Sequence, residues 1–153
     1  MRIRKAVPDD VCRVAEILVF NNRLNFFPIF RDEEYSFVEM NVFSVAQSYR
    51  DDPKKLNQTW LCDDNGIVKG FVQIDGEEVV RLYVEPGFQS AGVGGHLLDY
   101  AVAQGANRLW ALEKNVRGIA FYRRHGFLPT GEKTFEEGTA EYLVRLALEP
   151  NFR

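Results

Sequence analysis

The sequence predicts a single α/β domain with a mixed, mostly antiparallel sheet. Two turn signals, Asn65-Gly66 and Asp75-Gly76, separate three strand-like stretches in the middle of the chain, and such short turns join antiparallel strands. A helical stretch then connects two further strands, and a strand–helix–strand unit makes its two strands parallel. The 153 residues are the length of one ordinary domain.

The first third of the chain predicts one strand and two helices. Residues 2–7 alternate weakly as a short strand, and the Pro-Asp-Asp sequence at 8–10 is a helix start signal, because acidic residues are favoured in a first turn. Residues 21–30 are interpreted as an aromatic loop, followed by a second helix over residues 32–51. The first helix is predicted by apolar residues that recur on one face: Val11, Val14, Ala15 and Leu18.

The rest of the chain alternates strands and helices. Helices are expected over residues 94–104 and 116–125, and the second ends at Gly126, because glycine readily adopts the positive φ that closes a helix. The predicted element order is βααβββαβαββ. The remaining strands are expected at residues 58–62, 67–74, 79–84, 108–112, 127–135 and 141–148.

Composition and charge exclude several classes of protein. A net charge of −3 argues against nucleic acid as the main partner, since phosphate binding requires a basic surface. No apolar run approaches the ~20 residues of a membrane span, and the N-terminal residues lack the apolar core of a signal peptide, so we expect a cytoplasmic protein. Cys12 and Cys62 form neither a disulfide framework nor a zinc site, and we expect no metal and two buried free thiols.

The stretch that carries most chemical information is residues 84–95, which follows a strand and opens a helix. Glycines at 92, 94 and 95 permit close approach of the backbone to a ligand. The unpaired N–H groups and the positive end of the helix dipole would face an anion there. The stretch therefore predicts a phosphate or pyrophosphate site, with a tight turn that packs a helix against a strand as the simpler alternative.

Two familiar nucleotide-binding loops do not match this stretch. A Walker-type loop requires Lys and then Ser or Thr after its glycines, whereas Gly95 is followed by His96 and Leu97. A dinucleotide fingerprint would need its third glycine at the position of Leu97. His96 and His125 each lie beside a motif glycine but have no Ser or Cys partner, so we interpret both as surface or structural residues.

Two motifs resemble those of the GNAT superfamily of N-acetyltransferases. Gln-x-x-Gly-x-Gly at residues 89–94 is similar to the acetyl-CoA loop of that family. Residues 115–127 are similar to its Asn-x-x-Ala-x-x-Phe-Tyr-x-x-x-Gly-Phe segment, with one residue of drift around Ala120. The order of elements also matches the family fold over nearly the whole chain. The resemblance implies one N-acetyltransferase domain over residues 1–153, which moves an acetyl group from acetyl-CoA to a primary amine.

The resemblance also implies where acetyl-CoA binds. The strands that end at Val84 and Leu112 would be parallel but splayed, with the pantetheine arm between them. A local excess of basic residues between 104 and 126 suits the phosphates of CoA. The arm would pair with the backbone of Leu82, Tyr83 and Val84 and lie beside Asn115 and Phe121. The pyrophosphate would lie on N–H groups of Gln89, Ser90, Ala91, Gly92, Val93, Gly94 and Gly95.

The implied reaction is direct attack of the amine on the thioester. Tyr122 is placed by the motif to give a proton to the departing CoA thiolate. Glu78, at the start of the strand beside the site, is the better of two neighbouring acids for accepting the amine proton through water; a solvated turn acid is the alternative interpretation. A non-catalytic CoA-binding regulatory module is the alternative function, and a nucleotide-binding module is a weaker one.

The acceptor half of the site has no comparable motif. Phe26, Phe27 and Phe30, with Arg31, lie where the family places its acceptor-shaping loop, and they are candidates for an acceptor pocket or a lid. Core packing or a contact in a homodimer would use the same residues. Acidic clusters at residues 32–34 and 75–78 favour a cationic acceptor. A small molecule and a peptide both remain open as the amine acceptor.

Overall fold

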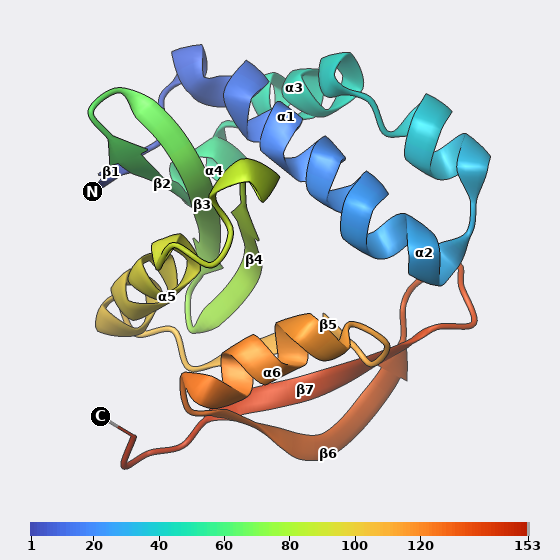
Figure 1. Ribbon diagram of the computed structural model, residues 1–153, viewed down its shortest axis with the longest axis vertical. Coiled ribbons are helices and arrows are strands. Elements are labelled where there is room, and N and C mark those ends of the chain that lie inside the picture. Colours follow the sequence, from blue (N-terminus) through green and yellow to red (C-terminus); the bar gives the residue numbers. More distant parts are fainter. Residues whose placement is uncertain (153) are drawn as a thin grey trace.

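The sheet of this protein is open and mixed, as seen in a computed structural model that describes residues 1–152 (Figure 1). The strand order is β1-β2-β3-β4-β5-β7-β6. Neighbouring strands are antiparallel except for β4 and β5, which are parallel. The predicted fold class is therefore confirmed. The strands are β1 (Arg2–Lys5), β2 (Thr59–Asp64), β3 (Ile67–Asp75), β4 (Glu78–Val84), β5 (Arg108–Leu112), β6 (Phe127–Phe135) and β7 (Tyr142–Leu148).

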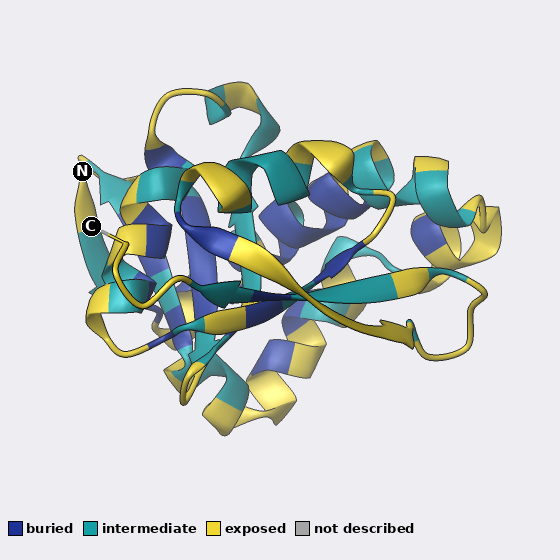
Figure 2. Ribbon diagram, turned by 90° about the horizontal axis from the view of Figure 1, so that it is seen from below, coloured by how far each residue is buried: buried dark blue, intermediate teal, exposed yellow. Residues whose placement is uncertain are grey.

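Helices cover both faces of the sheet. The face toward α1 and α3 contains one apolar cluster, and the face toward α5 and α6 contains another (Figure 1). Buried positions concentrate in these two layers, while β6 is largely exposed (Figure 2). The helices are α1 (Val11–Asn21), α2 (Phe27–Phe30), α3 (Val42–Asp51), α4 (Pro53–Asn57), α5 (Val93–Ala103) and α6 (Val116–Arg124).

The segment interpreted as an aromatic loop is helical, so that prediction is wrong. After α1 the chain makes a wide helical turn over Asn22–Phe26, in which the Phe27 N–H donates to the carbonyl of Asn22 five residues earlier. It then forms α2, which ends at Arg31 in the left-handed region with φ 55°. The wide turn interrupts the period of 3.6 residues, and for this reason the apolar pattern does not indicate a helix here.

The predicted second helix over residues 32–51 is also wrong in its extent. A short wide turn at Tyr35–Glu39 is separate from α3, and Met40 between them is extended. Asn41 starts a new helix because its side-chain oxygen accepts a hydrogen bond from the Ser44 N–H at 2.9 Å. This cap was not recognised in the sequence.

The two cysteines differ in environment. Cys62 is buried in β2, as predicted, but Cys12 is exposed, and the prediction for it is wrong. Cys12 follows the buried Val11 and lies on the solvent side of α1, where Arg50 Nη2 is 3.3 Å from its sulfur. Over residues 1–152, no helix is long and apolar enough to cross a membrane, and no three His, Cys, Asp or Glu side chains cluster as metal ligands.

Candidate active site

The parallel strands β4 and β5 are paired at one end only. Their register contains Glu78 with Arg108 and Val79 with Leu109, and no further pair. The register of β4 against β3 shifts at the next residue, so that Val80 has no partner. Such a bulge bends and twists a strand, and here it accompanies the departure of β4 from β5. The predicted splay is confirmed, and the gap opens toward the ends of both strands at Val84 and Leu112.

The edge of β4 that faces the gap offers backbone groups. The Glu85 N–H donates to Lys69 O at 2.8 Å, so Glu85 turns its backbone toward β3. Because alternate residues of an antiparallel strand face opposite edges, Tyr83 also faces β3, while Leu82 and Val84 face the gap. Three residues were predicted to pair with the pantetheine arm. Of these, Leu82 and Val84 direct backbone groups toward the gap, whereas Tyr83 directs its backbone toward β3 and its side chain toward α1.

The glycine-rich loop after β4 is open to solvent. Gly92 immediately precedes α5 and has φ 85°, a conformation that favours glycine, and Ser90 has φ 65°. A Cβ added at Gly87 or Gly92 would meet no atom within 4 Å. The N-terminus of α5, an 11-residue helix, therefore faces open space across exposed residues, as an anion site requires.

The next two glycines have a different role. A Cβ at Gly94 would lie 3.2 Å from the Phe121 ring, and one at Gly95 would lie 3.0 Å from His125. These glycines let α5 and α6 pack closely. The close packing at Gly94 and Gly95 is mainly between two helices, where the simpler interpretation expected a helix against a strand, and the anion site at Gly92 stays a prediction.

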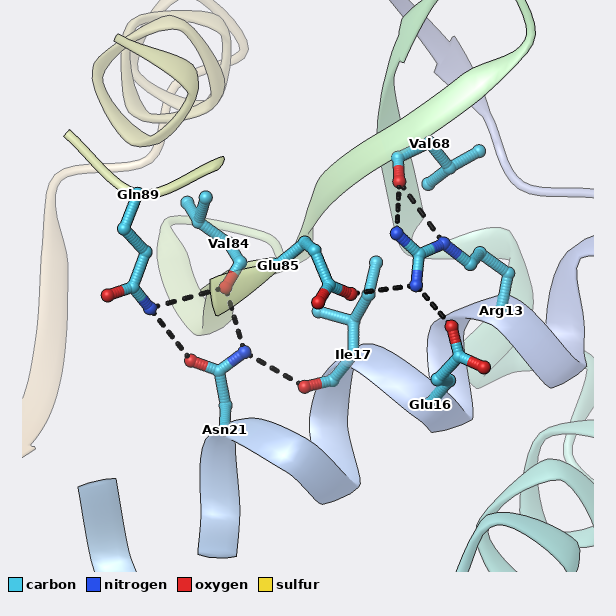
Figure 3. Close-up of polar contacts among 8 residues, drawn as sticks. All are labelled: Arg13, Glu16, Ile17, Asn21, Val68, Val84, Glu85 and Gln89. Atoms are coloured by element: carbon cyan, nitrogen blue, oxygen red, sulfur yellow. Dashed lines mark hydrogen bonds and ion pairs between the residues drawn. The ribbon is translucent and has the colours of Figure 1, made fainter. Parts of the chain in front are cut away.

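A buried asparagine ties this loop to α1, and the sequence analysis missed it. Asn21 is 3% exposed, and its Nδ2 donates to Val84 O and to Ile17 O, each at 2.9 Å (Figure 3). Gln89 Nε2 reaches the same junction, 3.4 Å from Val84 O and 3.5 Å from Asn21 Oδ1. The side chain of the motif glutamine therefore holds the loop in place and points away from solvent. Asn21 lies one turn after Leu18, on the apolar face of α1. A polar residue on that face was the signal in the sequence that could have identified Asn21 as a functional residue.

A second contact between α1 and the loop is an ion pair. Arg13 Nη1 is 2.7 Å from Glu85 Oε2, at the first residue after β4, and it also pairs with Glu16 (Figure 3). The same guanidinium donates to Val68 O at 2.8 Å from Nη2. Arg13 thus joins α1, β3 and the start of the loop, which fixes where the loop leaves the sheet.

The far side of the gap is formed by α6. Asn115 caps this helix, because its Oδ1 accepts from the Gly118 N–H at 3.1 Å. Phe121 packs on His125 with ring centroids 4.7 Å apart, and Tyr122 packs on Phe127 at 6.3 Å. Among the predicted basic residues, Lys114 pairs with Glu141 and Arg108 with Glu77. The others, Arg117, Arg123 and Arg124, are exposed and form no ion pair with a described residue.

The surroundings of Tyr122 favour the protonated form of its hydroxyl; its role as a proton donor stays a prediction. Burial raises the pKa of its hydroxyl above the usual value, and the neighbouring Tyr83 phenol raises it further. The hydroxyl is therefore protonated at neutral pH. Tyr83, across the gap on β4, lies on the face toward α1, where its ring contacts those of Phe71 and Phe26 at centroid distances of 5.6 and 6.0 Å.

Glu78 lies at the closed end of the β4–β5 pair. Its Oε1 is 2.8 Å from Arg145 Nη1 on β7, and this ion pair holds the carboxylate beside the point where the strands converge. Its role as a base stays a prediction.

The three aromatic residues predicted to shape an acceptor pocket have different contacts. Phe26 reaches β4 through its contact with Tyr83. Phe27 instead packs against Phe37 of the following wide turn, with ring centroids 5.0 Å apart. Phe30 is half-buried at the end of α2. Phe26 thus contacts β4 and Phe27 contacts the turn at Tyr35–Glu39, and the role of all three in an acceptor pocket stays a prediction.

A splayed parallel pair that leads into an open glycine loop at a helix N-terminus is the arrangement of an acyltransferase that uses a CoA thioester. The family model of the acetyltransferase (GNAT) domain matches residues 55–129. An uncharacterised N-acetyltransferase of Mycobacterium tuberculosis is 32% identical over 114 residues, which cover 67% of this chain and 72% of that protein. The chain belongs to the GNAT family of acetyltransferases, whose co-substrate is acetyl-CoA.

Solved structures share this fold at low sequence identity. An N-acetyltransferase from Staphylococcus aureus Mu50 superimposes with a TM-score of 0.77 at 11% identity, over 97% of this chain and 100% of that chain. The PaiA N-acetyltransferase from Thermoplasma acidophilum, solved in complex with coenzyme A, gives a TM-score of 0.66 at 20% identity, over 95% and 98%.

Proposed function

We propose that residues 1–153 act as one N-acetyltransferase domain that moves an acetyl group from acetyl-CoA to a primary amine of a small molecule or peptide. The observation that supports this most is the gap between β4 and β5, which ends at the open loop before α5 and has Tyr122 on its far side. A cytoplasmic location and the absence of a nucleic-acid partner stay predictions.

In this proposal the pyrophosphate of acetyl-CoA lies on the N–H groups of residues 89–95. The pantetheine arm follows the edge of β4 and pairs with the backbone of Leu82 and with the N–H of Val84, while Phe121 and the capped start of α6 at Asn115 line the other side. An arm that runs this way brings the thioester toward the bulge at Val80, where β4 and β5 converge.

The chemistry needed is a direct attack. An alkyl ammonium with a pKa of about 10.4 must first lose a proton, which costs roughly 4 to 5 kcal/mol at pH 7. The amine nitrogen then bonds to the thioester carbon and loses a second proton to water. The carbon–sulfur bond breaks, and Tyr122 gives its proton to the CoA thiolate and regains one from water. In this proposal Glu78 accepts the first amine proton through water.

The proposal is tested by ligand-dependent stability together with turnover. Acetyl-CoA at 100 times its dissociation constant should stabilise the protein by about 2.7 kcal/mol, whereas ATP and NAD should not stabilise it. Release of free thiol is then followed with a panel of amines. Stabilisation without thiol release from any amine would favour the non-catalytic CoA-binding module, and stabilisation by ATP or NAD in place of acetyl-CoA would contradict the family assignment of the loop.

Asn21→Ala is expected to weaken acetyl-CoA binding by about tenfold. The substitution leaves the Val84 carbonyl without its best donor and frees the Gln89 side chain, so the loop loses its fixed position, at a cost of the order of 1–3 kcal/mol. Titration calorimetry with acetyl-CoA measures the effect. Asn57→Ala, an exposed asparagine on α4, is the matched control and should bind like the wild type. Equal affinity of the two variants would show that Asn21 does not position the loop.

A further inference from the structure

Arg81 on β4 has an uncompensated charge next to the site. It follows the bulge at Val80, is half-buried, and donates from Nη1 to Gln73 Oε1 at 2.8 Å. Gln73 is itself buried and donates onward to Gln58 Oε1 at 3.1 Å. Within residues 1–152, no carboxylate forms an ion pair with Arg81.

This is unusual for a half-buried arginine of this chain. Arg4, Arg13 and Arg145 are each paired with at least one carboxylate. Arg23 has carbonyl acceptors, at Ser36 and Met40. Removing a charge from water is costly unless a counter-charge or several acceptors replace the water, and Arg81 has one neutral amide. The guanidinium therefore retains most of its capacity to bind an anion.

Two further groups beside Arg81 are suited to an anion. The Tyr49 side chain is fully buried and its hydroxyl has no hydrogen-bond partner. Lys55 Nζ lies 4.2 Å from the centroid of the Tyr49 ring, and burial together with the charge of Arg81 lowers the pKa of this lysine. Repulsion between the two cations would be relieved by a negative group between them. The unpartnered Tyr49 hydroxyl and Lys55, whose pKa values both respond to the charge of Arg81, thus lie on the α1 and α3 side of β4.

The same surface continues to the chemical centre through Tyr83. Tyr83 is two residues after Arg81, and its phenol acts on the pKa of both Tyr49 and Tyr122. Phe26 contacts its ring and supplies an apolar wall. Burial raises the pKa of Tyr83, Arg81 opposes this rise, and Glu136 of the turn between β6 and β7 adds to it. Arg81 and Glu136 therefore both lie near enough to Tyr83 to act on its pKa, with opposite effects.

We propose that Arg81 binds the carboxylate of the acceptor, and that the acceptor is a free amino acid whose amine faces the thioester. This inference rests on the proposed acetyl transfer. The carboxylate takes the place of the missing counter-ion, the ammonium lies toward Glu136, and the side chain packs on Phe26 and Tyr83. The products are an N-acetyl amino acid and CoA, with the amine proton released to water.

The decisive experiment compares acceptors that differ only in the carboxylate. Phenylalanine is paired with phenethylamine and leucine with isoamylamine, and thiol release gives kcat/KM for each. The wild type should prefer the acid at least tenfold. Arg81→Gln should lower kcat/KM for the acids at least tenfold and leave the amines unchanged, whereas Arg50→Gln, an exposed arginine on α3, should behave like the wild type. A wild type that prefers the amines, or an Arg81→Gln loss equal for acids and amines, would overturn the inference.

Binding of the products separates this inference from the proposed function. Titration calorimetry with N-acetylphenylalanine and N-acetylphenethylamine, with and without CoA, reports on the pocket without requiring turnover. At least tenfold tighter binding of the acid, abolished in Arg81→Gln, supports the site even if no acceptor is acetylated and the proposed function fails. Equal binding of the two products overturns the Arg81 site even if amines are acetylated. Thermal unfolding of both variants checks that they are folded.

Discussion

Replacing Tyr122 with Phe should lower kcat by about 10²-fold and leave the dissociation constant of acetyl-CoA within about twofold. General acids contribute of the order of 10²–10⁴-fold, and a thiolate leaving group needs less help than an alkoxide, so the lower end is expected. The ring contacts with Phe121 and Phe127 do not depend on the hydroxyl, and the site should keep its shape. Steady-state thiol release and titration calorimetry measure the two quantities.

The control for this variant is Tyr100→Phe on α5, whose ring packs on Trp60 with centroids 5.0 Å apart. It should retain wild-type turnover. The pH profile adds a second readout: because burial raises the pKa of Tyr122, the wild type should show no loss of activity from this group up to about pH 10. Unchanged kcat in Tyr122→Phe would exclude the hydroxyl as the proton donor.

The second large effect concerns stability. Arg4→Met is expected to reduce the free energy of unfolding by about 2 kcal/mol at pH 7, since it leaves two largely buried carboxylates without their partner. Arg4 Nε is 2.8 Å from Asp63 Oδ2 and Nη1 is 2.8 Å from Asp10 Oδ2. Asp10 also accepts from the Val7 N–H at 2.8 Å, so the pair fixes the junction of β1 and α1. Urea unfolding measures the loss.

The pH dependence of this loss has a definite sign. Hydrogen bonds from Arg4 hold the pKa of Asp10 and of Asp63 below the usual range. A carboxyl whose pKa is lower in the folded state stabilises above its unfolded pKa, about 3.9, and loses that contribution as the pH falls through the folded value. The difference between wild type and Arg4→Met should therefore be full at pH 7 and shrink below about pH 4. Arg2→Met, exposed on the same strand, is the control; a difference that grows on acidification would contradict the assignment.

The strands and the glycine loop were predictable because their signals are local. Asn65 has φ 54° and Gly66 has φ 87°, and the hairpin between β2 and β3 forms at the turn that this pair predicts. The open conformation at Gly92 likewise follows from its place between a strand and a helix. These elements are specified by residues that are neighbours in the chain.

The contacts that hold the glycine-rich loop against α1 were not predictable in the same way. Asn21 and Val84 are 63 residues apart in sequence, as Arg13 and Glu85 are 72 residues apart. Their partners are chosen by the packing of α1 on the sheet, which no local pattern encodes. The sequence equally could not show that Arg81 lacks a carboxylate partner within the described residues. That property depends on which side chains the fold brings beside it.

The sparse pairing of β4 with β5 also has a mechanical consequence. The sheet consists of two panels of strands, β1-β2-β3-β4 and β5-β7-β6. They are joined at a seam of two residue pairs between β4 and β5. Outside this seam the panels are joined by the ion pair of Glu78 with Arg145, and by α5 and α6, which touch where Gly94 meets Phe121 and Gly95 meets His125. Close packing at these two glycines is therefore one determinant of the stiffness of the joint, and a molecule bound between the panels would further limit their relative motion.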